Sequence, residues 1–229
     1  MGKFKDKNYG TCLSFNGTSN KIETALWVAS NDSYSMGAWF RSRNYKQTRQ
    51  TIISNGNGVT GDANSRGLAI VLSGNSTTDG SLYLLDHNIA WVNLSTKVRD
   101  HKWHHIFVVL DASGHPSVYL DGVIIYSGPA VTVTDAKTKS LVGADNNGAG
   151  GFFYGLIDEV RFYSAILTAS EVSEIYHGTE ISTVPANWYK LDEGSGTTAS
   201  DSGSSAKTGT ITGATYSTDV VRGIRTKIP

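Results

Sequence analysis

The residues best suited to chemistry in this chain are its carboxylic acids, and their spacing argues against catalysis. A retaining glycosidase needs two carboxyl groups roughly 5 Å apart. On a strand this requires acids at positions i and i+2 or i and i+4, because alternate side chains share a face. No Asp or Glu pair has that spacing. Asp158-Glu159 and Asp192-Glu193 are adjacent pairs, so on strands their members are expected to face opposite sides. We therefore expect no catalytic residues and no enzyme.

A histidine cluster next to Trp103 is the next candidate, and it does not have the spacing of a metal site. His104 and His105 are neighbours, so on a strand they point in opposite directions. Zinc needs ligands that converge on one point. The single Cys12 cannot form an internal disulfide. We expect structural roles for these residues.

Five aromatic side chains are the predicted ligand-binding residues. Phe152, Phe153 and Tyr154 follow a glycine-rich run, Trp91 lies near the end of an expected strand, and Tyr45 stands in a basic segment. Aromatic rings stack on sugars and pack against protein partners equally well. The prediction therefore leaves a glycan and a protein surface open as ligands.

Short strands joined by tight turns must position these residues. Asp121-Gly122 lies between two apolar runs and predicts a hairpin, because both central residues of a type I′ turn need positive φ. Further strands are expected at 11–15, 21–24, 34–41, 51–54, 68–72, 81–85, 90–93, 104–111, 140–143, 155–163, 188–191 and 209–216. One accessory helix is expected, because Thr168 and Glu171 form a capping box and Gly178 supplies a stop.

Composition supports an all-β fold, a two-sheet antiparallel β-sandwich. Apolar residues make up 39% of the 229 residues, which is enough for a large core, and charged residues only 17%. Acids and bases balance at 20 each, which argues against a nucleic-acid partner. The sequence has no apolar run long enough to insert into a membrane and no signal peptide pattern.

Four stretches of the sequence resemble a known family when they are taken together. They are 12–17, 103–106 with 118–122, 155–163 with the helix that follows, and 188–202. In combination they resemble the laminin-G-like, concanavalin A-like family of jelly rolls. The resemblance implies one domain over 1–229, but in the family the stretch similar to 191–202 opens the domain. We expect a circular permutant in which 186–220 supplies the strands that usually open the fold. The alternative is that this segment is exchanged with a neighbouring subunit in a homo-oligomer.

The same resemblance implies one structural calcium ion. The Asp matching Asp158 is a metal ligand in relatives, together with carbonyl oxygens of the turn matching Asn16-Gly17. Calcium prefers several oxygen ligands. Glu193 and Asp201 are expected to add ligands if the last strands fold beside the first.

The leading functional hypothesis is a non-catalytic recognition or structural module. We expect a virion-associated protein, such as a phage decoration, capsid or tail protein, that binds a glycan or a protein surface. Its expected place is the virion or an extracellular surface, reached without a signal peptide. One alternative is the carbohydrate-binding module of a secreted bacterial protein, and another is a glycoside hydrolase or lyase with dispersed catalytic groups.

Overall fold

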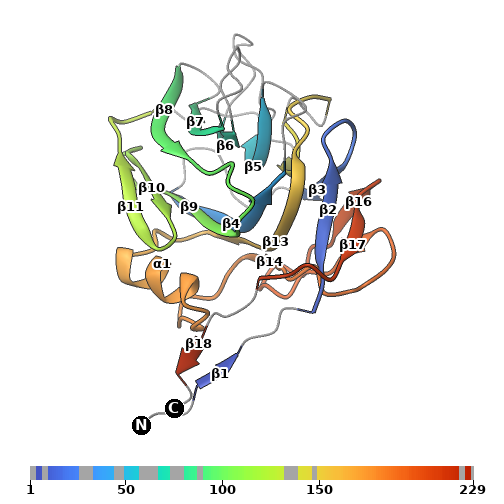
Figure 1. Ribbon diagram of the computed structural model, residues 1–229. Coiled ribbons are helices and arrows are strands. Elements are labelled where there is room, and N and C mark those ends of the chain that lie inside the picture. Colours follow the sequence, from blue (N-terminus) through green and yellow to red (C-terminus); the bar gives the residue numbers. More distant parts are fainter. Residues whose placement is uncertain are drawn as a thin grey trace.

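The computed structural model describes the strands of a sandwich and the segments that connect most of them (Figure 1). The described residues are 4–6, 10–25, 33–43, 49–56, 67–72, 80–86, 90–131, 139–145, 149–221 and 225–227. None of the helices in these ranges is long and apolar enough to span a membrane.

Sheet 1 is antiparallel and runs in the order β11-β10-β9-β4-β13-β2-β17, with β14 also paired to β13. Its strands are β2 (Cys12–Asn16), β4 (Tyr34–Ser42), β9 (His104–Leu110), β10 (Pro116–Leu120), β11 (Val123–Ser127), β13 (Tyr154–Tyr163), β14 (Asn187–Tyr189) and β17 (Thr215–Ser217). Strands β2 and β14 lie end to end along one edge of β13, because β2 pairs with the first half of β13 and β14 with the second.

Sheet 2 is also antiparallel and runs in the order β15-β16-β3-β12-β5-β6-β7-β8. Its strands are β3 (Lys21–Ala25), β5 (Gln50–Gly56), β6 (Gly67–Leu72), β7 (Ser81–Asp86), β8 (Ala90–Lys97), β12 (Lys139–Val142), β15 (Thr198–Ala199) and β16 (Gly209–Thr212). A separate pair, β1 (Phe4–Asp6) with β18 (Arg225–Lys227), brings the two termini together (Figure 1).

The main core fills the space between the two sheets. Alternation along β4 shows how it forms, since Met36, Ala38 and Phe40 belong to this core while Trp39 belongs to a cluster on the other face of sheet 1. Successive side chains of a strand point to opposite faces, so this alternation is what a strand buried on both faces requires. The expected two-sheet antiparallel sandwich is therefore confirmed.

The predicted hairpin at Asp121-Gly122 is confirmed, with β10 and β11 paired across it. Asp121 and Gly122 have φ values of 51° and 77°, so both central residues of the turn lie in the left-handed region. Glycine adopts this conformation without steric cost, and Asp tolerates it better than most residues.

The single described helix, α1 (Ala169–Tyr176), covers part of the outer face of sheet 1. Thr168 caps it and forms the predicted capping box with Glu171. Val172 and Ile175 pack against Phe107 and neighbouring side chains of the sheet in a second hydrophobic cluster. The helix thereby closes one side of a pocket, through Ile175.

The C-terminal segment pairs with both sheets within the chain. β14 pairs with β13, β17 with β2, and β16 with β3. Tyr189, Leu191, Ala199 and Ile211 from this segment are buried in the main core. The segment therefore contributes to the same hydrophobic core as the strands that precede it.

Candidate functional site

A polar pocket lies on the outer face of sheet 1 and is built by three adjacent strands. Asn16 of β2 lies directly opposite Tyr154 of β13. Arg43, just after β4, donates its backbone N–H to the Tyr154 carbonyl, with an N–O distance of 3.0 Å. Directly opposed residues share a face of a sheet, so the three side chains form one row. We call this site the strand pocket, and its volume is about 260 Å³.

The strand pocket offers several kinds of polar group around one ring. Asn20, Ser14 and Thr215 complete its polar lining. Asn16 is held by its own turn, because its side-chain oxygen accepts hydrogen bonds from the backbone N–H groups of residues 18–20. The Arg43 guanidinium makes no ion pair with any residue in the described part of the chain. A guanidinium and hydroxyls around Tyr154 can exchange hydrogen bonds with a ligand rich in hydroxyl groups, whereas the Asn16 amide is already used by its own turn.

The five predicted aromatic residues have different positions. Tyr154 is half-buried and lines the strand pocket, and Phe152 is half-buried beside it in sequence. Tyr45 lies outside the described residues, as does the side chain of Trp91 in β8. The prediction that Phe153 faces a ligand is wrong, because its side chain is 0% exposed and packs edge-on against Phe15 and Phe40 in the main core.

A β-bulge in β13 puts Asp158 and Glu159 on one side of the sheet. Asp158 pairs with Trp39, and the register then shifts before Arg161. Ile157 and Val160 both belong to the main core, so the two acids between them lie outside it. The extra residue is Glu159, whose φ of 50° is unusual for a residue other than glycine. The expectation that the adjacent acids face opposite sides is therefore wrong.

The bulge also creates a buried ionic network around Glu159. Its Oε2 accepts hydrogen bonds from Arg161 Nη2 and from the indole N–H of Trp188, both at 2.7 Å. The Arg161 guanidinium and the Lys190 ammonium each lie 4.3 Å from the centroid of the Trp188 ring. Glu159 is thus fixed as an ion-pair partner, which does not suit a catalytic acid or base.

Asp158 does not form the calcium site that was expected from the resemblance. Asn16 lies opposite Tyr154, four residues before Asp158 on the same strand. This separation is about 13 Å at 3.3 Å per residue, so Asp158 and the Asn16-Gly17 turn cannot bind one ion together. The proposed additional ligands are also engaged elsewhere. Glu193 accepts hydrogen bonds from Ser200 and Tyr216, and the carboxylate of Asp201 accepts several from its surroundings.

The surroundings of Asp158 nevertheless fit a cation bound in another way. Its side chain is 0% exposed, and its Oδ2 atom has no hydrogen-bond partner among the described residues. Burial, followed by the charge of Glu159, raises its pKa well above the ordinary value, and Asp192 adds to this effect. Asp192 itself accepts a hydrogen bond from the Thr11 N–H. No group of three or more His, Cys, Asp or Glu side chains in the described part of the chain converges on one point, so further ligands here would be carbonyl oxygens or water.

The two neighbouring histidines have opposite environments. His105 is buried against Trp39 and Phe107, and this burial lowers its pKa to about 3. His104 lies between two carboxylates, with Nδ1 2.8 Å from Asp121 and Nε2 3.1 Å from Asp100. Burial alone would lower the pKa of His104, but the two carboxylates outweigh it and the pKa is raised. These contacts indicate a structural role for both histidines.

The fold defines a class of protein, the lectin-like β-sandwiches. Comparison with family models gives a match over residues 16–173, more than half of the chain, to the concanavalin A-like lectin/glucanase superfamily. The chain belongs to this superfamily. No curated protein matches it in sequence.

Several solved structures share the fold. A candidate carbohydrate-binding protein from Bacteroides ovatus is 18% identical and superposes with a TM-score of 0.72, over 93% of this chain and 61% of its own length. Domain 4 of AbnA, an extracellular arabinanase from Geobacillus stearothermophilus, is 24% identical with a TM-score of 0.58, over 77% of this chain and 81% of that domain. The CBM40 domain of a Ruminococcus gnavus sialidase is 14% identical with a TM-score of 0.55, over 75% of this chain and 98% of that domain. This chain therefore spans less than two thirds of the Bacteroides protein.

Proposed function

We propose that the protein is a non-catalytic carbohydrate-binding module and that the strand pocket is its glycan site. One observation carries the proposal, namely the row in which Asn16, Tyr154 and Arg43 stand side by side on three paired strands. A tyrosine ring packs against the C–H groups of a sugar, and guanidinium and hydroxyl groups exchange hydrogen bonds with its hydroxyls. The strands are rigid, so little ordering free energy opposes binding.

The structural neighbours support the same class of ligand. The AbnA domain was solved with arabinotriose, and the CBM40 domain was solved with sialyllactose. Both are domains of larger enzymes, which supports a binding role more than a catalytic one for a chain of this fold. The state of two adjacent acids also favours a binding role over a catalytic one, because Glu159 is held in an ion pair and Asp158 is buried. Release of reducing sugar from a polysaccharide by the purified protein would contradict the non-catalytic proposal.

The expected effect of Tyr154→Ala is at least a tenfold loss of glycan affinity, because it removes the ring at the centre of the row. Arg43→Ala should cost about tenfold through lost charge-assisted hydrogen bonds. A glycan array that includes arabino-oligosaccharides and sialyllactose would identify the ligand, and titration calorimetry would measure each variant.

The matched control is Tyr126→Ala, which removes another half-buried tyrosine from β11 at the far edge of sheet 1. It should bind as the unmodified protein does. If the array shows no binding at all, or if Tyr154→Ala and Tyr126→Ala bind equally well, the strand pocket is not the glycan site.

We propose in addition that Asp158 and Asp192 bind one structural Ca²⁺. A buried carboxylate oxygen without a partner supports this assignment, and the charge of Asp192 helps to raise the pKa of that carboxyl group. An ion bound only to the folded state at about 100 times its Kd adds about 2.7 kcal/mol, which should raise Tm by roughly 5–10 °C at this chain length. Thermal melts in CaCl₂ and in EDTA test this for the protein and for Asp158→Asn, which should lose the difference.

Glu193→Gln is the control for the calcium experiment, because both Glu193 oxygens already accept hydrogen bonds from the chain. It should keep the full response to Ca²⁺. Identical melts of the unmodified protein in CaCl₂ and in EDTA would contradict the proposal.

Display on a virion or on an extracellular surface, with a capsid or another protein surface as partner, stays a proposal that rests on the sequence. It is supported by the recognition class of the fold and by the balanced charge of the chain. Mass spectrometry of purified particles and of culture supernatant would test it. Recovery in neither fraction would contradict it.

A further inference from the structure

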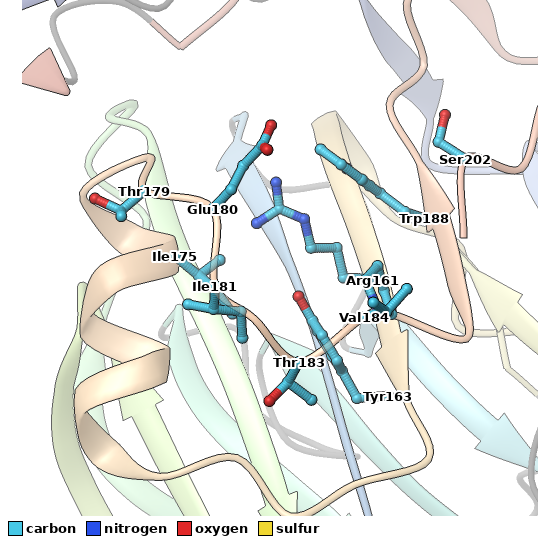
Figure 2. A pocket seen from close by; sticks show the side chains of 11 residues that line it. Arg161, Tyr163, Ile175, Thr179, Glu180, Ile181, Thr183, Val184, Trp188 and Ser202 are labelled. Atoms are coloured by element: carbon cyan, nitrogen blue, oxygen red, sulfur yellow. The ribbon is translucent and has the colours of Figure 1, made fainter. Parts of the chain in front are cut away.

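A second pocket lies between helix α1 and the segment 179–185, on the outer face of sheet 1 (Figure 2). Its volume is about 200 Å³. Ile175 of the helix and Ile181 and Val184 of the connecting segment form apolar walls. We call it the helix pocket. It shares no lining residue with the strand pocket.

Two buried polar groups point into the helix pocket. Arg161 is 7% exposed and its guanidinium occupies the middle of the pocket (Figure 2). Of its nitrogens, Nη2 donates to Glu159, while Nε and Nη1 make no hydrogen bond with a described residue. Tyr163 is 2% exposed, and its hydroxyl makes no hydrogen bond with a described residue. A charged donor and a neutral donor therefore face the same apolar space.

The chemistry of this lining selects one kind of ligand. An arginine offers only donors, and its planar fork matches a carboxylate. The apolar walls favour an aliphatic or aromatic group behind the carboxylate, because sugar hydroxyls placed there would lose their hydrogen bonds to water. The Trp188 ring already has two cation–π partners, the Arg161 guanidinium and the Lys190 ammonium, each 4.3 Å from its centroid.

We propose that the helix pocket is a second binding site, separate from the glycan site, for a small carboxylate that carries an apolar group. The guanidinium of Arg161 and the hydroxyl of Tyr163 bind the carboxylate, and the walls around Ile175 and Ile181 receive the apolar group. Glu180 lies at the mouth beside the guanidinium (Figure 2) and makes no ion pair with it. Its negative charge opposes the entry of an anion.

The test uses 3-phenylpropionate and 4-methylpentanoate as probes, with their uncharged amides as controls. Protein-detected NMR titration of the full chain should show each acid binding at least tenfold more tightly than its amide, because only the acid pairs with Arg161. Tyr163→Phe should weaken the acids about tenfold without loss of stability, since the hydroxyl has no partner to lose. Glu180→Gln should strengthen them about two- to threefold by removing the opposing charge.

Tyr119→Phe is the matched control, because Tyr119 is a buried tyrosine on the same face of sheet 1 and does not line the pocket. It should leave the affinity for both acids unchanged. Equal binding of acids and amides, no effect of Tyr163→Phe, or no shifts on addition of either acid would each overturn the proposal. The glycan proposal fails separately, because it depends on Tyr154 and Arg43 and neither residue is changed here.

Discussion

Removal of residues 186–229 is expected to abolish cooperative folding of the rest of the chain. The deletion takes β14 from β13, β17 from β2 and β16 from β3. It also removes Tyr189, Leu191, Ala199 and Ile211 from the main core. Burying a large apolar side chain contributes about 1.5–3 kcal/mol, and a domain is stable by only about 5–15 kcal/mol in total. The loss is therefore of the same size as the whole stability.

Circular dichroism melts and amide NMR spectra of the chain ended after Pro185 would measure this effect. The control ends after Val221, which removes β18 and keeps every strand of the two sheets. It should unfold cooperatively. A chain ended after Pro185 that melts at an unchanged temperature would show that the C-terminal segment does not belong to this core.

The same deletion tests the exchange of strands between subunits. A peptide of residues 186–221 added to the truncated chain should restore the cooperative transition, since the pairing needs no covalent link. If the full chain exchanges this segment, it should elute as a dimer and lose the dimer on truncation after Pro185. If it pairs the segment internally, as in the structure, it should elute as a monomer.

Local signals in the sequence predict the elements of this fold well. The Asp121-Gly122 turn and the Thr168 capping box each depend on a few adjacent residues, and both are present in the structure. Their physics acts over three or four residues, so the strand order is not needed to recognise them. The family match could likewise be expected from short stretches along the chain.

The strand pocket depends on pairing between strands that are far apart in the sequence. The sequence alone does not reveal this pairing. Asn16, Tyr154 and Arg43 meet only because β2, β13 and β4 are neighbours in a particular register. Of these, Arg43 was missed, since a lone basic residue after a strand carries no local signal. Phe153 was misassigned for a related reason. Its neighbour Tyr154 has the same sequence context, and only the alternation of side chains at the start of β13 decides which ring faces the core.

The bulge in β13 had the largest consequence for the chemistry. Simple alternation separates Asp158 from Glu159, whereas one extra residue brings both to one side. Arg161, Tyr163 and Trp188 were not predicted as site residues either. They converge because β14 pairs with β13 beyond the bulge, with Trp188 opposite Arg161. A positive φ at a glutamate is hard to foresee, because glycine and asparagine are the usual signals for it.

Arg161→Met is expected to destabilise the protein by about 3–5 kcal/mol, the cost of leaving a buried charge without its partner. Glu159 is 3% exposed, and without Arg161 its carboxylate keeps the Trp188 indole N–H as a hydrogen-bond donor but has no cation. Urea denaturation should show a lower midpoint at an unchanged slope, because the folded state loses stability without losing surface burial.

The double variant Glu159→Gln/Arg161→Met separates the buried charge from the lost packing. A neutral glutamine still accepts the Trp188 hydrogen bond through its amide oxygen, so the double variant should recover at least about 1 kcal/mol relative to Arg161→Met. A double variant no more stable than Arg161→Met would mean that arginine packing over Trp188, and not charge pairing, holds this region. In that case the packing of Arg161 over the Trp188 ring would stabilise the bulge. The ion pair with Glu159 would then contribute less than its 2.7 Å hydrogen bond indicates.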